Sequence, residues 1–165
     1  MPIAVTHTVV INQTEDDPGG EVFSYDKLFD WLVRKAEFPI DYVPAITDCR
    51  IVERYPDGFL REAVFYGEDA VLERVTPRRD RYSVRFEVVD DPKMTEVRNE
   101  LDRDAEGRYT YTLVNVLSDR TVTRIREVAG VLEQVEQAVL ETAVSTAATL
   151  RKAVLGETVP ASAPA

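Results

Sequence analysis

Apolar and polar residues alternate with a period of two in two stretches of the chain. Residues 3–13 form the first stretch, and one face of it carries Ile3, Val5, His7, Val9 and Ile11. This alternation is typical of a half-buried strand. Residues 48–116 alternate in the same way, which predicts six further strands in an antiparallel meander. The turn signals between them are Asp57-Gly58, Gly67-Glu68-Asp69, Arg78-Arg79-Asp80, Asp90-Asp91-Pro92 and Ala105-Glu106-Gly107.

Elsewhere the apolar residues recur at helical intervals of three and four. After a predicted loop at residues 16–20, Ser24 is a candidate N-cap for a helix. The apolar face of that helix is Tyr25, Leu28, Phe29, Leu32, Val33 and Ala36. Pro39 begins a short helical turn that Pro44 ends. Beyond Leu117 a long helix with one apolar stripe follows, and it begins either after Asp119 or near Gly130. A helix from Val131 to Leu155 would be about 37 Å long.

This order of elements predicts an α+β fold. A seven-stranded curved antiparallel sheet surrounds a long C-terminal helix, with two short helices after the first strand. We expect residues 1–155 to form a single ligand-binding domain and residues 156–165 a disordered tail. A curved sheet around one helix leaves an internal cavity, so the order also predicts a binding site for a small molecule.

Composition excludes several classes of partner. The net charge of −10 would repel phosphates, so we expect neither nucleic acid nor an anionic membrane as a partner. No apolar run approaches the roughly 18 residues of a membrane span. Cys49 is the only cysteine and no secretory signal is visible, which together indicate a cytoplasmic protein. A common zinc site, a phosphate loop and a dinucleotide motif are all missing, so we expect no cofactor. The chain is expected to be a monomer or a homodimer.

The turns also predict which side chains face the interior. If the second turn pairs Tyr66 with Ala70, Glu62 lies opposite Arg74 on the neighbouring strand. The next turn then places Val84 opposite Arg74. This face is the more apolar one and is expected inside: Leu60, Glu62, Val64, Tyr66, Leu72, Arg74, Tyr82, Val84 and Phe86. The opposite face becomes an exposed ladder of alternating charge, Arg61–Glu73–Arg85, with Phe65 and Glu87.

The turns at Ala105–Gly107 and at Asp57-Gly58 assign the remaining side chains to the interior or the exterior face. The turn at Ala105–Gly107 adds to the interior Val97, Asn99, Leu101, Tyr109, Tyr111 and Leu113. The second strand has two alternatives, because one residue of slip reverses every side chain. A two-residue turn at Asp57-Gly58 directs Cys49 and Ile51 inward, whereas a three-residue turn directs Val52 inward.

An apolar surface with a few convergent polar groups is the usual composition of a small-molecule site. Glu62 is a candidate general base, and Arg74 a candidate group to stabilise an enolate or carboxylate oxygen. The alternative for this pair is a structural ion pair. The candidate ligand-binding residues are His7, Tyr66, Tyr82, Phe86, Asn99, Tyr111 and Leu113. Core filling is the alternative for the tyrosines and His7, and capping of a backbone group is the alternative for Asn99.

Short segments distributed along the chain resemble a known superfamily. They are Val9-Val10-Ile11-Asn12, Trp31 with Lys35-Ala36, Val43-Pro44-Ala45-Ile46 with Cys49, Leu60-Arg61-Glu62 with Phe65, Glu73-Arg74-Val75, and Asn99. Together they resemble the START-like, helix-grip (SRPBCC) superfamily, and within it the AtaL-like branch of small bacterial and fungal proteins. The resemblance extends to about Leu155. It implies a deep cavity for apolar molecules, in relatives that carry lipids or hormones or act as polyketide cyclases, aromatases or dehydratases.

Three hypotheses about function follow. In the first, the protein binds an apolar or aromatic, polyketide-like small molecule and promotes its cyclisation, dehydration or isomerisation in natural product biosynthesis. In the second, it is a non-catalytic carrier or sensor for the same class of ligand. In the third, it is a protein-interaction module that uses the outer charged ladder. A fold shared with other proteins does not choose among them.

Overall fold

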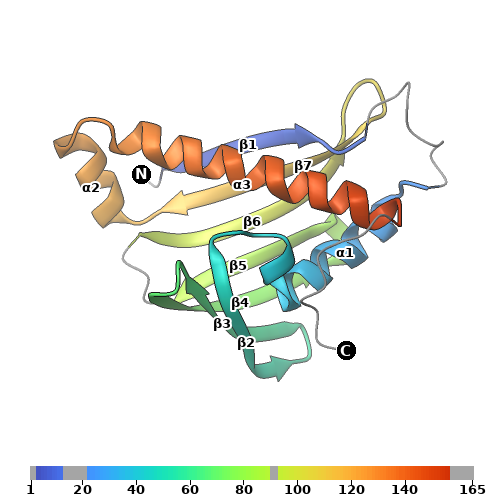
Figure 1. The fold of residues 1–165 in the computed structure, drawn as a ribbon, viewed down its shortest axis with the longest axis horizontal. Helices are drawn as coiled ribbons and strands as arrows, with labels where there is room; N and C mark the ends of the chain where they lie inside the picture. The colour runs from blue at the N-terminus through green and yellow to red at the C-terminus, as the bar shows by residue number, and fades with distance from the viewer. Residues whose placement is uncertain (1–2, 13–21, 90–92, 157–165) are drawn as a thin grey trace.

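The strands form one antiparallel sheet in the computed structural model, which describes residues 3–12, 22–89 and 93–156. The spatial order is β1-β7-β6-β5-β4-β3-β2, so the first strand closes against the last and the others form a meander. The bounds are β1 (Ala4–Val10), β2 (Ile46–Tyr55), β3 (Gly58–Phe65), β4 (Asp69–Arg78), β5 (Ser83–Val89), β6 (Met94–Arg103) and β7 (Tyr109–Leu117). Figure 1 shows the sheet curving beneath one long helix, which confirms the predicted fold class.

The helices are α1 (Tyr25–Glu37), the 3₁₀ turn η1 (Pro39–Asp41), α2 (Asp119–Glu127) and α3 (Val131–Val154). Two of the helices, α1 and α2, begin at serine N-caps. The Ser24 hydroxyl accepts a hydrogen bond from the Lys27 N–H at 3.1 Å, which confirms the predicted N-cap of α1. Each of the two alternative starts predicted for the last helix begins a helix, because α2 starts at Asp119 and α3 at Val131. Gly130, with a φ of 85°, lies in the break between them.

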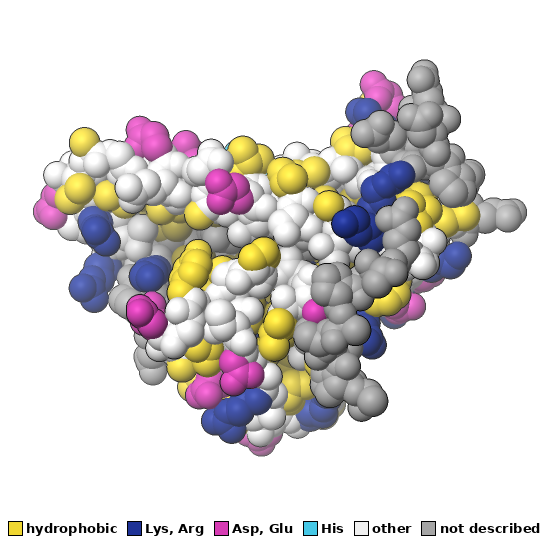
Figure 2. Space-filling model, in the orientation of Figure 1, with side chains coloured by type: hydrophobic (Ala, Val, Ile, Leu, Met, Phe, Trp, Pro, Cys, Tyr) yellow, Lys and Arg dark blue, Asp and Glu magenta, His cyan; other side chains and the backbone are white. Residues whose placement is uncertain are grey.

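The core lies between the concave face of the sheet and two helices. α3 packs across β1 and β7, while α1 packs against β5 and β6 and touches α3 (Figure 1). Buried residues of α3 are small or aliphatic, including Ala143, Ala147 and Leu150, so the helix approaches the sheet closely. Figure 2 shows hydrophobic side chains along α3. No helix in the described part of the chain is long and apolar enough to cross a membrane.

The β2–β3 hairpin decides between the two alternatives for the second strand. Tyr55 pairs with Gly58, so the turn consists of residues 56 and 57 and lies one position earlier than Asp57-Gly58. A bulge between Ile51 and Glu53 leaves Val52 unpaired and 43% exposed. Cys49 and Ile51 therefore pack against the core. The predicted loop at 16–20, the turn at 90–92 and the tail from 157 lie outside the described residues.

Candidate functional site

The faces of β3 and β4 are the reverse of those predicted. Arg61 and Glu73 pair across the two strands and are only 3% and 4% exposed, so they lie on the concave, helix-covered face. Glu62 pairs with Leu72 and Arg74 with Leu60, on the convex face. The prediction that Glu62 lies opposite Arg74 in the interior is therefore wrong. The interior positions predicted for Leu60, Val64 and Leu72 are wrong for the same reason.

The cause of the reversal is the connection between β4 and β5. Arg78 pairs with Ser83, so four residues connect the strands instead of the predicted three. Three of the four form a 3₁₀ turn, and Tyr82 follows with a φ of 47°. A connection that is one residue longer exchanges the two faces of one strand relative to the other. Val84 and Phe86 still face the interior as predicted, and they are 0% and 2% exposed.

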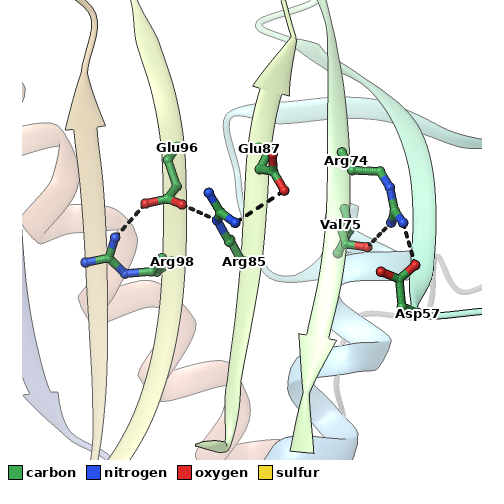
Figure 3. Close-up of polar contacts among 7 residues, drawn as sticks. All are labelled: Asp57, Arg74, Val75, Arg85, Glu87, Glu96 and Arg98. Carbon is green, nitrogen blue, oxygen red and sulfur yellow. Dashed lines mark hydrogen bonds and ion pairs between the residues drawn. The ribbon is translucent and has the colours of Figure 1, made fainter.

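Glu62 and Arg74 each have another partner on the outer surface. The Glu62 carboxylate lies 3.1 Å from Arg50, whose side chain is 68% exposed. Arg74 donates to the Asp57 carboxylate at 2.5 Å and to the Val75 carbonyl at 3.0 Å, as Figure 3 shows. Solvent screens exposed pairs of this kind, so they contribute little to stability. The structure does not bring these two candidate catalytic residues together.

A row of alternating charges does lie on the convex face, but its residues belong to β5 and β6 and are not those predicted. Arg85 contacts Glu87 and Glu96, and Arg98 contacts the same Glu96 at 2.6 Å (Figure 3). The predicted row Arg61–Glu73–Arg85 is wrong, since its first two members are buried. Opposite charges at neighbouring positions of a sheet face give modest stabilisation and keep that face solvated.

Three ionisable side chains meet in the interior, and we call them the buried charged cluster: Lys35, Arg61 and Glu73. The Arg61 Nε and Nη2 atoms both donate to Glu73 Oε1, at 3.0 and 2.9 Å. A third Arg61 nitrogen donates to the Ala36 carbonyl at 2.7 Å, at the end of α1. The guanidinium lies 4.7 Å from the ring centre of Phe86 on β5. Arg61 thus joins two strands to α1.

Lys35 extends from α1 toward the same ring. Its side chain is 5% exposed, and its ammonium nitrogen lies 5.4 Å from the Phe86 ring centre. The pKa of Lys35 is lowered to about 7, mainly by loss of hydration and further by the Arg61 charge, while the Glu73 charge opposes both. An amine with that pKa exists in both protonation states near neutral pH. It can therefore bind an anion or accept a proton.

A second group of polar side chains is buried without partners, and we call it the unpaired polar group: Asn99, Tyr111 and Thr146. They are at most 1% exposed and come from β6, β7 and α3. Asn99 Oδ1 and both hydroxyl oxygens lack hydrogen-bond partners among the described residues. Burial raises the pKa of the Tyr111 phenol, and a side-chain interaction with the Thr146 hydroxyl opposes this in part. These two hydroxyls therefore lie close to each other, although their geometry is not that of a hydrogen bond. Each unpaired group costs about 1–3 kcal/mol.

The register of β6 and β7 agrees with the prediction. Asn99 pairs with Leu113, and Leu101 with Tyr111. His7 pairs with Leu113 from the other side, so the strand alternation places it on the same concave face. Of the predicted ligand-binding residues, this face includes His7, Phe86, Asn99, Tyr111 and Leu113.

Two predicted tyrosines lie elsewhere. Tyr66 lies in the β3–β4 turn with a φ of 53° and is 73% exposed, so its predicted interior position is wrong. Tyr82 lies at the end of the sheet and stacks on Tyr25 of α1, with ring centres 4.6 Å apart. Its contacts are those of a packing residue at the edge of the core.

A cleft of about 230 Å³ opens between the end of α1 and β2. Its lining residues are Glu37, Phe38, Pro39, Ile40, Cys49, Ile51 and Arg54. Ile51 pairs directly with Arg61, so the wall of the cleft adjoins the buried charged cluster. Burial raises the pKa of the Cys49 thiol; the Arg61 charge opposes this, while the Glu73 and Asp48 charges add to it.

Sequence reasoning missed four interior polar residues, although each leaves a signal. Lys35 follows Leu32 by three positions and Leu28 by seven, so it falls on the predicted apolar face of α1. Thr146 falls in the apolar stripe of α3 in the same way. Arg61 and Glu73 were assigned to the wrong face. The segments that carry the resemblance contain three of these four residues, together with Asn99.

The fold defines the class of protein. The aromatase/cyclase Zhui from Streptomyces sp. R1128 is similar with a TM-score of 0.69 and 14% identity, over 96% of this chain and 100% of that chain. The di-domain ARO/CYC StfQ from the steffimycin biosynthetic pathway has a TM-score of 0.64 and 8% identity, over 94% of this chain and 52% of that one. A START superfamily protein from Mycobacterium smegmatis has a TM-score of 0.58 and 16% identity, over 93% of this chain and 97% of that chain. The chain therefore has the START-like helix-grip fold.

A family model identifies the branch. The family described as "Acetylaranotin biosynthesis cluster protein L" (AtaL) matches residues 5–156, and the chain belongs to this family. No curated protein matches it in sequence. The resemblance inferred from short segments is thus confirmed.

Proposed function

We propose that this protein binds an apolar or aromatic, polyketide-like small molecule between the concave face of the sheet and helices α1 and α3. The observation that carries the proposal is the unpaired polar group, Asn99, Tyr111 and Thr146, buried on facing surfaces of the sheet and α3. The family description names a biosynthesis cluster, and two proteins of similar fold are titled aromatase/cyclases, which supports the proposed ligand class.

Stability alone does not explain these three side chains. Leucine, phenylalanine and valine have nearly the same shapes as Asn99, Tyr111 and Thr146 and lack the unpaired polar atoms. Replacing an unpaired buried polar group by an apolar one of the same shape is neutral or stabilising. A ligand with carbonyl and hydroxyl groups offers both the donors that Asn99 Oδ1 needs and the acceptors that the two hydroxyls need. Polyketide-like molecules carry both kinds of group.

The proposal includes a reaction, namely cyclisation, dehydration or isomerisation of the bound molecule without a cofactor. Fixed hydrogen-bonding groups, an acceptor on β6 and hydroxyls on β7 and α3, would hold a flexible chain in one conformation, and such positioning accelerates ring closure. A carrier or sensor would use the same contacts without changing the ligand. Comparing the compound added to the protein with the compound extracted after incubation separates these two functions, since a dehydrative cyclisation removes one water.

Asn99→Leu and Thr146→Val are expected to have opposite effects on stability and on binding. The ligand-free variants should be as stable as the wild type or more stable, by about 1 kcal/mol each, because an unpaired polar atom is removed. Ligand retention should fall at least tenfold, because each lost hydrogen bond to the ligand is worth about 1.5 kcal/mol. The measurements are urea unfolding, and mass spectrometry of small molecules released when the purified protein is denatured.

Glu62→Gln and Arg74→Met are the matched controls, since both side chains lie on the convex face. They should change neither the masses released nor their amounts. The proposal fails if native and denatured samples release the same small molecules, or if the interior variants retain the ligand as well as the controls do.

A further inference from the structure

The buried charged cluster carries an excess of positive charge. Arg61 directs two of its nitrogens to a single oxygen of Glu73, so this guanidinium already balances the one carboxylate. Arg61 and Glu73 are also the charges that act on Lys35, and β5 contributes the uncharged ring of Phe86. With Lys35 protonated, the cluster therefore has a net charge of +1 in a site that is almost closed to water.

An uncompensated buried charge is unfavourable, and the lowered pKa of Lys35, about 7, reflects this. A methionine or leucine would fill the same position without that cost. An anion placed beside Lys35 would cancel the excess charge and favour the protonated amine. The buried charged cluster therefore has an excess positive charge without an anionic ligand group, and it is electrically neutral with one.

The cluster also adjoins a space that a ligand can enter. Ile51 and Cys49 line the cleft of about 230 Å³, and Ile51 is the direct cross-strand neighbour of Arg61. The lining of the cleft is mostly apolar: Phe38, Pro39, Ile40, Cys49 and Ile51. The two other lining residues, Glu37 and Arg54, pair with each other at 3.2 Å. A molecule with an apolar body and one acidic end matches this surface, because its body would cover the apolar lining beside Ile51, the cross-strand neighbour of Arg61.

We propose that the protonated Lys35 amine is the receptor for an acidic group of the bound small molecule, either a carboxylate or the enolate of a β-dicarbonyl unit. This inference rests on the proposed function and narrows its ligand class to acidic apolar or aromatic compounds. Arg61 and Glu73 act as positioning residues, because their mutual hydrogen bonds leave Lys35, among the residues that the structure describes, without an anion paired to it alone.

A pair of fluorescent probes tests this proposal. Anilinonaphthalene sulfonate and phenylnaphthylamine share the same aromatic body, but only the first carries an anionic group, and that sulfonate stays ionised at all working pH values. Binding of the sulfonate should weaken roughly 25-fold between pH 6.5 and pH 8.5 as Lys35 loses its proton, whereas binding of the neutral probe should be unaffected.

Lys35→Met should abolish the pH dependence for the sulfonate and weaken its binding at pH 6.5 at least tenfold, while the neutral probe binds as before. Arg74→Met is the control, because it removes an arginine from the convex face. Sulfonate binding that keeps its pH dependence in Lys35→Met overturns the inference. If both probes bind independently of Lys35 but depend on Asn99, the proposed function survives without it. If neither probe binds, both proposals are wrong.

Discussion

Arg61→Met is expected to lower the free energy of unfolding by about 3–5 kcal/mol, a large fraction of the stability of a single domain. The substitution leaves the Glu73 carboxylate buried without its two hydrogen bonds and the Ala36 carbonyl without its donor. Urea unfolding at pH 7.5, extrapolated linearly to water, measures this loss. The midpoint should fall while the slope stays the same, because the surface exposed on unfolding is nearly unchanged.

A second substitution tests the cause of that loss. In the double variant Arg61→Met with Glu73→Leu, most of the lost stability should return, because a buried ion pair replaced by apolar side chains of similar size is close to neutral. Arg85→Met is the surface control, since this arginine is 51% exposed and contacts Glu87 and Glu96 on the convex face. It should cost about 1 kcal/mol at most. A loss in Arg61→Met no larger than the loss in Arg85→Met would show that the pair contributes nothing special.

The element order was predictable because each element has a local signal. Ser24 caps α1, alternation marks the strands, and Gly130 is one of the two starts predicted for the last helix. That residues 119–127 form a separate helix, α2, was not predicted. The β6–β7 register was also predictable, since it depends on one turn with a glycine at positive φ, Gly107. Asn99, Tyr111 and Leu113 were therefore placed correctly on the interior face.

The charged part of the site was not predictable, for two physical reasons. The β4–β5 connection contains Tyr82 at a φ of 47°, a conformation uncommon for residues other than glycine, and no residue pattern announced it. The interior face was then chosen by the number of apolar side chains on it. That criterion treats every charge as exposed, whereas Arg61 and Glu73 are buried because they satisfy one another. An ion pair between residues on neighbouring strands cannot be predicted until the register of those strands is known.

The second large effect expected is a dependence of stability on pH that Lys35 alone produces. In the folded protein its pKa is about 7, whereas in the unfolded chain it is near 10.4. Between these values the unfolded chain binds more protons, so stability rises with pH and falls on acidification. From pH 7 to pH 8.5 the free energy of unfolding should rise by about 1–2 kcal/mol, and the melting temperature by roughly 3–6 °C.

Lys35→Met should remove this slope and stabilise the protein at pH 7 by up to about 4 kcal/mol, because the cost of keeping the amine buried disappears. The range ends at pH 8.5 because burial also raises the pKa of Cys49, and that group lowers stability as pH rises further. Lys152→Met, on an exposed position of α3, is the control and should keep the wild-type slope. Parallel pH profiles for the wild type and Lys35→Met would mean that Lys35 titrates as it does in water. The amine would then be protonated throughout this range, and its charge would not switch ligand binding near neutral pH.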